Sequence, residues 1–243
     1  SEHLASALNE IKHTGNVAFE IGILDVAAKV QYMKGNYTVA LDYCLKAVSK
    51  SEKIGDDQQL ASSLGNTGVL FKELLDYDKA IAYFSKAMEI NKRIGRKSSL
   101  AANLMNIGVA YEMKLEYDSA YHYFKKALDI NIELNRLSGQ VYTYCNMGLN
   151  RMKKGMNSAA EPLFVKSWEL AQELKDDFTT LFVSLSTADF YTAIGKTKEA
   201  QALLDEAFEI GLKMKAAKSL MDAYKLQSNL YQKQGLYAEA LHN

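Results

Sequence analysis

The chain has 243 residues, with 29 basic and 29 acidic side chains, and 48% of its residues are hydrophobic. This balance is typical of a folded globular protein and excludes a disordered one. The lack of a basic excess argues against nucleic-acid binding, and no stretch approaches the roughly 20 apolar residues of a membrane helix. A single proline, Pro162, indicates an almost wholly helical chain, because proline breaks helix interiors.

The sequence repeats itself every forty residues, and residues 56–95 align without gaps on residues 96–135. Small residues recur at fixed positions, which marks places where two helix backbones approach closely. Large apolar residues one turn away fill the space beside them. One unbroken series of small residues is Ala40, Ala80, Ala120, Ala160, Ala200 and Ala240.

Each unit is predicted to contain two helices with a short turn between them, because its apolar residues have helical spacing. Asp56 and Asp176 follow predicted helix ends and can cap the helix that comes next. Gly and Asn tolerate the left-handed conformation that ends helices. The second helices are therefore predicted to end near Gly15, Gly55, Gly95 and Asn135.

The predicted division of the chain is a single domain, 1–243, made of these units. It comprises the tail of a second helix at 1–15, complete repeats at 16–55, 56–95, 96–135, 136–175 and 176–215, and a partial repeat at 216–243. Because each repeat buries its apolar face on its neighbours, we expect the natural protein to continue on both sides.

The fourth repeat is irregular. Arg151 replaces the expected aromatic residue, and Pro162 falls inside the predicted second helix. The proline can delay the helix start or kink the helix, with a local change of curvature, or the repeat has simply drifted in sequence.

The motif Leu64-x2-Thr67-Gly68-x2-Phe71, followed by Ala80-x3-Phe84-x2-Ala87, resembles the tetratricopeptide repeat, and the resemblance covers essentially the whole chain. It implies an all-α fold, a right-handed superhelical solenoid of antiparallel helix pairs. The period exceeds the family's usual length of about 34 residues. In this it resembles kinesin light chains and bacterial signalling proteins, in which such repeats precede a histidine kinase or a helix-turn-helix output domain.

In tetratricopeptide proteins the first helices line the concave face where partners bind, so the resemblance implies a groove here. The stripe of each first helix that faces away from the packing side supplies the candidate residues. These are Asn66, Val69, Met105, Asn106, Val109, Met113, Tyr142, Cys145, Asn146, Leu149, Phe182, Leu185 and Asp189.

Two features of this stripe each have two interpretations. The row Asn66, Asn106 and Asn146 can bond the backbone of an extended peptide, since an amide both donates and accepts, or it can bond neighbouring helices and stiffen the stack. The surrounding residues are unusually apolar, which indicates a ligand-binding surface or a surface filled by the protein's own C-terminal segment.

Residues with catalytic potential are scattered. His3, His13, His122 and His242 form no metal-binding pattern, Cys44 occupies a packing position, and Cys145 has no paired base. No glycine-rich phosphate loop is present. We therefore expect no enzyme activity, no bound metal and no cofactor.

The sequence thus favours a non-enzymatic scaffold that binds a protein or peptide in its groove, without contacting nucleic acid or membrane. The alternative is the sensory segment of a bacterial membrane-bound signalling protein that controls a kinase or DNA-binding output domain. As a sensor ectodomain it would be periplasmic, and otherwise cytoplasmic.

Overall fold

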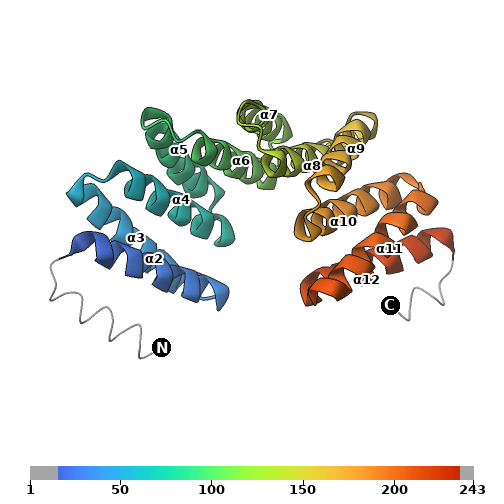
Figure 1. The fold of residues 1–243 in the computed structure, drawn as a ribbon, viewed down its shortest axis with the longest axis horizontal. Coiled ribbons are helices and arrows are strands. Elements are labelled where there is room, and N and C mark those ends of the chain that lie inside the picture. The colour runs from blue at the N-terminus through green and yellow to red at the C-terminus, as the bar shows by residue number, and fades with distance from the viewer. Residues whose placement is uncertain (1–15, 236–243) are drawn as a thin grey trace. The chain divides into compact units, whose positions relative to one another are not determined.

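The computed structural model describes residues 16–235, which form eleven α-helices and no strand (Figure 1). The helices are α2 (Val17–Met33), α3 (Tyr37–Ile54), α4 (Asp57–Glu73), α5 (Tyr77–Arg93), α6 (Lys97–Met113), α7 (Tyr117–Glu133), α8 (Leu137–Lys153), α9 (Asn157–Leu174), α10 (Asp177–Ile194), α11 (Thr197–Met214) and α12 (Ala217–Gln234). The expected helix tail at 1–15, the last part of the partial repeat, and His3, His13, Gly15, Ala240 and His242 lie outside the described residues.

The helices follow the forty-residue period of the sequence. The first helices of the pairs begin at residues 17, 57, 97, 137, 177 and 217, and the second helices at 37, 77, 117, 157 and 197. The predicted all-α fold of repeated helix pairs is confirmed. The helices pack in two compact units that divide between Ala127 and Leu128, within α7. Unit 1 contains α2–α6, and unit 2 contains α8–α12.

The predicted helix ends and caps are present. Gly55, Gly95 and Asn135 all have positive φ angles, of 68°, 73° and 50°, which is the left-handed region that ends helices. The carboxylate of Asp56 accepts a hydrogen bond from the backbone of Gln59, and Asp176 caps α10 in the same way. Such caps satisfy amides that have no partner within the helix.

Glycines let the two helices of a pair approach closely. Gly68 and Gly108 are buried against the rings of Phe84 and Phe124. A Cβ atom added at Gly108 would lie only 2.5 Å from the Phe124 ring. The position of Cys44 is also as predicted, because its side chain is 1% exposed and packs in the core of unit 1.

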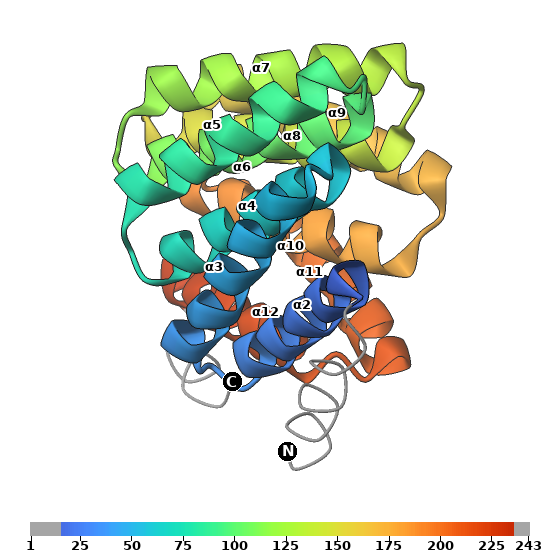
Figure 2. The same ribbon diagram turned by 90° about the vertical axis from the view of Figure 1, so that its left-hand side faces the viewer.

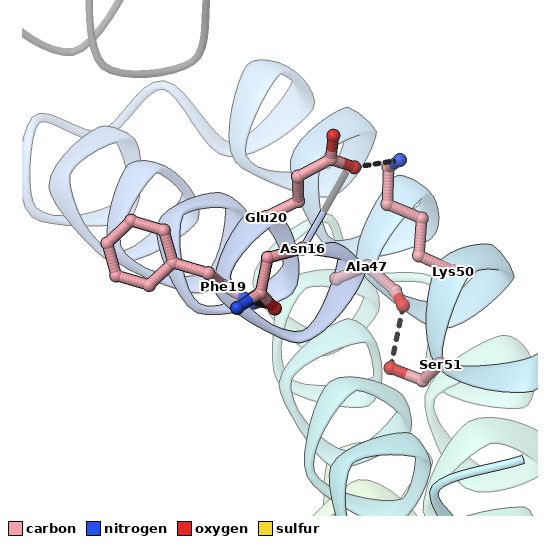
Figure 3. Close-up of polar contacts among 6 residues, drawn as sticks. All are labelled: Asn16, Phe19, Glu20, Ala47, Lys50 and Ser51. Atoms are coloured by element: carbon pink, nitrogen blue, oxygen red, sulfur yellow. Dashed lines mark hydrogen bonds and ion pairs between the residues drawn. The ribbon is translucent and has the colours of Figure 1, made fainter. Parts of the chain in front are cut away.

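Polar contacts fix the first pair of unit 1 (Figure 3). The side chain of Asn16 accepts a hydrogen bond from the backbone amide of Phe19 at 3.1 Å, which caps α2. The ammonium of Lys50 on α3 pairs with the carboxylate of Glu20 on α2. Helices α2 and α3 are therefore joined by an ion pair as well as by their apolar faces.

The irregular fourth repeat keeps its register in unit 2. Helix α9 begins at Asn157, forty residues after the start of α7, and Pro162 lies inside it. Pro162 therefore does not delay the helix start. Arg151 is 8% exposed, and its guanidinium donates to the sulfur of Met156 at 3.5 Å.

Candidate functional site

Unit 1 has a pocket of about 480 Å³ between α2 and α4, the first helices of its first two pairs. Helix α3 packs on both α2 and α4 (Figures 1 and 2), and its Cys44 lines the pocket together with residues of those two helices. The wall is mainly apolar. Its residues are Asp25, Val26, Ala28, Lys29, Tyr32, Cys44, Ser62, Asn66, Val69 and Leu70. Asn66 and Val69 thus line a pocket on the stripe where the sequence analysis placed them.

Asp25 is the acidic residue of this pocket. Its Oδ2 accepts a hydrogen bond from the side-chain amide of Gln59 on α4 at 2.7 Å, whereas its Oδ1 is buried and has no hydrogen-bond partner among residues 16–235. Burial raises the pKa of Asp25, and the nearby amides of Gln59 and Asn66 oppose that effect. Burial and the charge of Asp25 in turn raise the pKa of Cys44 to about 12.

Unit 2 has a second pocket, of about 420 Å³, on its own first helices α8, α10 and α12. Four predicted residues line it: Leu149, Phe182, Leu185 and Asp189. Its other lining residues are Phe178, Leu181, Ser186, Ser219, Asp222, Lys225 and Leu226. Each pocket therefore lies on the first helices of its own unit.

Aromatic side chains cluster beside the unit 2 pocket. The rings of Tyr142 and Phe182 lie 5.3 Å apart, and the Tyr142 hydroxyl shares a hydrogen bond with the Thr179 hydroxyl at 3.4 Å. Phe178, one turn before Phe182, is 63% exposed. At the same register, the three preceding units have the polar residues Gln58, Ser98 and Ser138. An exposed aromatic in this position enlarges the apolar surface of the pocket.

Asp189 is the predicted acidic residue of the unit 2 stripe, and it is half-buried. Burial raises its pKa, while the positive charges of Lys153 and Lys233 lower it. Asp189 therefore has cationic neighbours within unit 2, whereas none of the ion pairs among residues 16–235 involves Asp25.

The prediction that Cys145 lies on the groove-facing stripe is wrong. Its side chain is fully buried, in a core cluster with Val141, Phe164 and Val183, and so it does not line the groove face. Burial raises its pKa to about 12, against hydrogen bonding to Ser186 and Ser167. Met105 and Leu185 occupy the same register and are only half-buried, because their longer side chains extend beyond the space that encloses a short thiol.

The three asparagines of the predicted row have different surroundings. Asn66 is exposed and lines the unit 1 pocket near Asp25, and Asn106 is half-buried in the same unit. In unit 2, the amide of Asn146 donates to the backbone carbonyl of Tyr142, one turn earlier in α8, at 2.8 Å. The row is therefore not a set of equivalent side chains.

The remaining predicted residues lie on α6. Met105, Asn106 and Val109 are half-buried, and Met113 is 47% exposed. None of them lines the unit 1 pocket. Sequence reasoning missed Asp25, Asp222 and Lys225, although the forty-residue register that gave the other stripes extends to α2 and α12.

Metal ligands do not gather in the part of the chain that the structure describes, where no three His, Cys, Asp or Glu side chains are placed to hold a metal ion. Among helices α2–α12, none combines the length and hydropathy needed to span a bilayer.

The sequence model of the tetratricopeptide repeat family matches residues 21–93 and 68–133. The helix pairs of the structure continue the same period through residue 234. Residues 21–133 belong to the tetratricopeptide repeat family. A comparison with curated proteins gave no match.

Solved tetratricopeptide repeat structures share the fold of this repeat protein. Aspartyl phosphate phosphatase F from Bacillus subtilis has a TM-score of 0.78 at 17% identity, over 99% of this chain and 62% of that chain. A Rap protein complexed with competence and sporulation factor has a TM-score of 0.73 at 16% identity, over 97% of this chain and 76% of that chain.

A third similar structure is a signal transduction ATPase from Pyrococcus horikoshii with a tetratricopeptide repeat sensor. Its TM-score is 0.75 at 16% identity, over 96% of this chain and 36% of that chain. At these identities the likenesses show the fold alone.

Proposed function

We propose that this tetratricopeptide repeat protein is a non-enzymatic scaffold that binds a protein or peptide. The binding surface is the stripe of the first helices that faces away from the packing side. The observation that carries the proposal is the apolar pocket of unit 2, where Phe178, Phe182 and Leu185 line about 420 Å³. Pockets of roughly 300–1,000 Å³ with apolar walls and a few polar groups are typical of ligand sites. Aromatic side chains, phenylalanine among them, are enriched in protein interfaces relative to the rest of the surface.

The ligand-bound state of a fold relative supports the same proposal. The Rap structure was solved with competence and sporulation factor bound. In unit 1, Asn66 and Val69 would contribute to the binding surface together with Met105, Asn106, Val109 and Met113 of α6. In unit 2, Tyr142, Asn146, Leu149 and Asp189 would do so.

The test is selection of binders from a displayed random peptide library, followed by titration of the selected peptides. We expect Phe178→Ser combined with Phe182→Ser to weaken binding by about tenfold or more, because aromatic anchors carry most of such energy. Leu212→Ser is the matched control, since Leu212 is also 63% exposed and lies outside the pocket. Equal affinity of the double variant and the control would contradict the proposal.

A second candidate is a sensory segment in a bacterial signalling protein, with the repeats biasing a kinase or DNA-binding output domain. It is favoured by the likeness to the tetratricopeptide repeat sensor of the P. horikoshii signal transduction ATPase. Reading the coding sequence on both sides of this segment tests it. An output domain would support this role, and its absence on both sides would contradict it.

A further inference from the structure

The unit 1 pocket contains an acidic group whose hydrogen bonding is incomplete. Asp25 uses Oδ2 to accept from Gln59, and its Oδ1 is buried without a donor among the described residues. A buried carboxylate oxygen without a partner is costly, since it has lost water and gained nothing in return. A donor that reaches Asp25 from a ligand would remove that cost.

No residue of the described chain neutralises Asp25. Among residues 16–235, no lysine, arginine or histidine forms an ion pair with it, and its pKa is raised by burial. Lys29 lines the same pocket one turn later on α2, but its side chain is exposed. Cys44 is buried close to Asp25 and is a neutral thiol, because its own pKa is about 12.

The walls around Asp25 suit an alkyl chain. Val26 and Tyr32 of α2 and Val69 and Leu70 of α4 contribute apolar surface to the pocket. Lysine and arginine bury their methylene stems along such surface and keep a charged head for an acidic partner. A charge pair in a mainly apolar pocket is also stronger than one in water.

We propose that the α2–α4 pocket takes one basic side chain, lysine or arginine, from a bound peptide. Its cationic nitrogen pairs with Asp25, and its stem lies against Val26, Tyr32 and Val69. The inference rests on the proposed function, because it names the residue type that a bound peptide presents to unit 1. Asn66 and Ser62, which line the same pocket, are placed to bond the peptide backbone beside that residue.

The test uses the whole chain and capped single amino acids as probes: Nα-acetyl-lysine amide, Nα-acetyl-arginine amide and Nα-acetyl-norleucine amide. The capped norleucine has the same four-carbon side chain as the lysine stem and lacks the lysine charge. Binding is followed by amide chemical shifts in NMR, which also locate the probe on α2 and α4. We expect the two basic probes to bind saturably, with an affinity about tenfold or more higher than that of capped norleucine.

Asp25→Asn is the variant that tests the carboxylate itself. It keeps an oxygen to accept from Gln59 and replaces the other carboxylate oxygen by an NH2 group, which removes the charge. We therefore expect the fold to be retained and binding of capped lysine to fall to the level of capped norleucine. The melting temperature should rise, because the unpaired charge is gone. Asp42→Asn on α3 is the matched control, since Asp42 is exposed and outside the pocket, and it should bind capped lysine as the wild type does.

Several outcomes overturn the inference. The inference fails if capped norleucine binds the wild type as tightly as capped lysine does. It also fails if Asp25→Asn binds capped lysine as tightly as the wild type does. Butylamine binding as tightly as capped lysine would show a site for a free amine rather than for a peptide residue. If the Phe178→Ser, Phe182→Ser variant binds the selected peptides as tightly as Leu212→Ser does, the proposed function fails at the unit 2 pocket, and the charge dependence at Asp25 still stands.

Discussion

The side-chain amide of Asn91 donates a hydrogen bond to the side-chain oxygen of Asn103 at 2.8 Å, and both residues are buried. The bond joins α5 to α6, the second helix of one pair to the first helix of the next. One period later in unit 2, Asn131 and Thr143 make the equivalent contact at 3.3 Å. Further along the same register, the pairs are Ala171 with Val183 and Gly211 with Ala223. The contact between successive pairs thus changes from polar to apolar along the chain.

Removing one partner of this bond should cost more stability than removing both. Asn103→Ala leaves the Asn91 amide buried without an acceptor, and we expect it to lower the free energy of unfolding by about 1–3 kcal/mol. Asn91→Ala with Asn103→Val reproduces the apolar pair found at residues 171 and 183, and it should be more stable than the single variant. Urea denaturation measures both. A double variant less stable than Asn103→Ala would contradict the interpretation.

Two helical glycines should respond oppositely to the same substitution. Gly108→Ala drives a Cβ into the Phe124 ring, so we expect a loss of about 1–3 kcal/mol from overpacking. Gly65→Ala has its nearest neighbour at 3.7 Å, and it should gain about 0.5–1 kcal/mol because alanine favours helix. Thermal or urea unfolding of both variants gives the comparison. A stabilised Gly108→Ala protein would show that α6 and α7 are not packed as described.

Asn150 should be replaceable with a gain in stability. Its side chain is fully buried, and neither its amide nitrogen nor its oxygen has a hydrogen-bond partner among the described residues. At the same register, Leu70 and Leu230 are buried in the cores of their units. Asn150→Leu should therefore raise the free energy of unfolding by about 1–2 kcal/mol. A fall in stability would indicate a buried partner for the amide, such as an ordered water.

The cap of α10 should give a pH-dependent contribution to stability. Hydrogen bonds from the hydroxyl and backbone of Thr179 lower the pKa of Asp176. A carboxylate whose pKa is lower in the folded state stabilises the fold above its unfolded pKa, and this contribution is lost as pH falls through the folded pKa.

Asp176→Ala should therefore cost about 1 kcal/mol near pH 7, and the difference from the wild type should shrink in acid, as the pH falls through the lowered pKa of Asp176. Asp205→Ala is the control, because Asp205 is exposed and caps no helix. A difference that stays constant from neutral to acidic pH would contradict a charged cap.

The fold was predictable because the same physical requirement recurs every forty residues. Small residues such as Gly68 and Ala80 are needed wherever helices cross, and glycine or asparagine wherever a helix ends in the left-handed region. These requirements are local and repeated, so a single sequence displays them several times. The irregular Pro162 left only a detail open, since the start of α9 is set by the register of the surrounding helices.

The site was less predictable, because it depends on what is not repeated. The register places Asp25 with Gly65, Met105, Cys145 and Leu185, a position that varies in size and charge between units. Its exposure depends on how far each side chain extends from between neighbouring helices. Periodicity predicts the face of the helix on which a residue lies. It does not predict how deeply Cys145 is buried, or that Oδ1 of Asp25 has no hydrogen-bond partner among the described residues.

The constant spacing of the helix starts has a consequence for the gene. First helices begin forty residues apart from residue 17 to residue 217. One extra residue within a helix would rotate every later side chain of that helix by about 100° about the helix axis. Insertions of one complete period leave all faces aligned, whereas most shorter insertions misalign them. Recombination between neighbouring repeats therefore yields in-frame chains that can still fold, and the number of helix pairs can change without any redesign of the contacts between them.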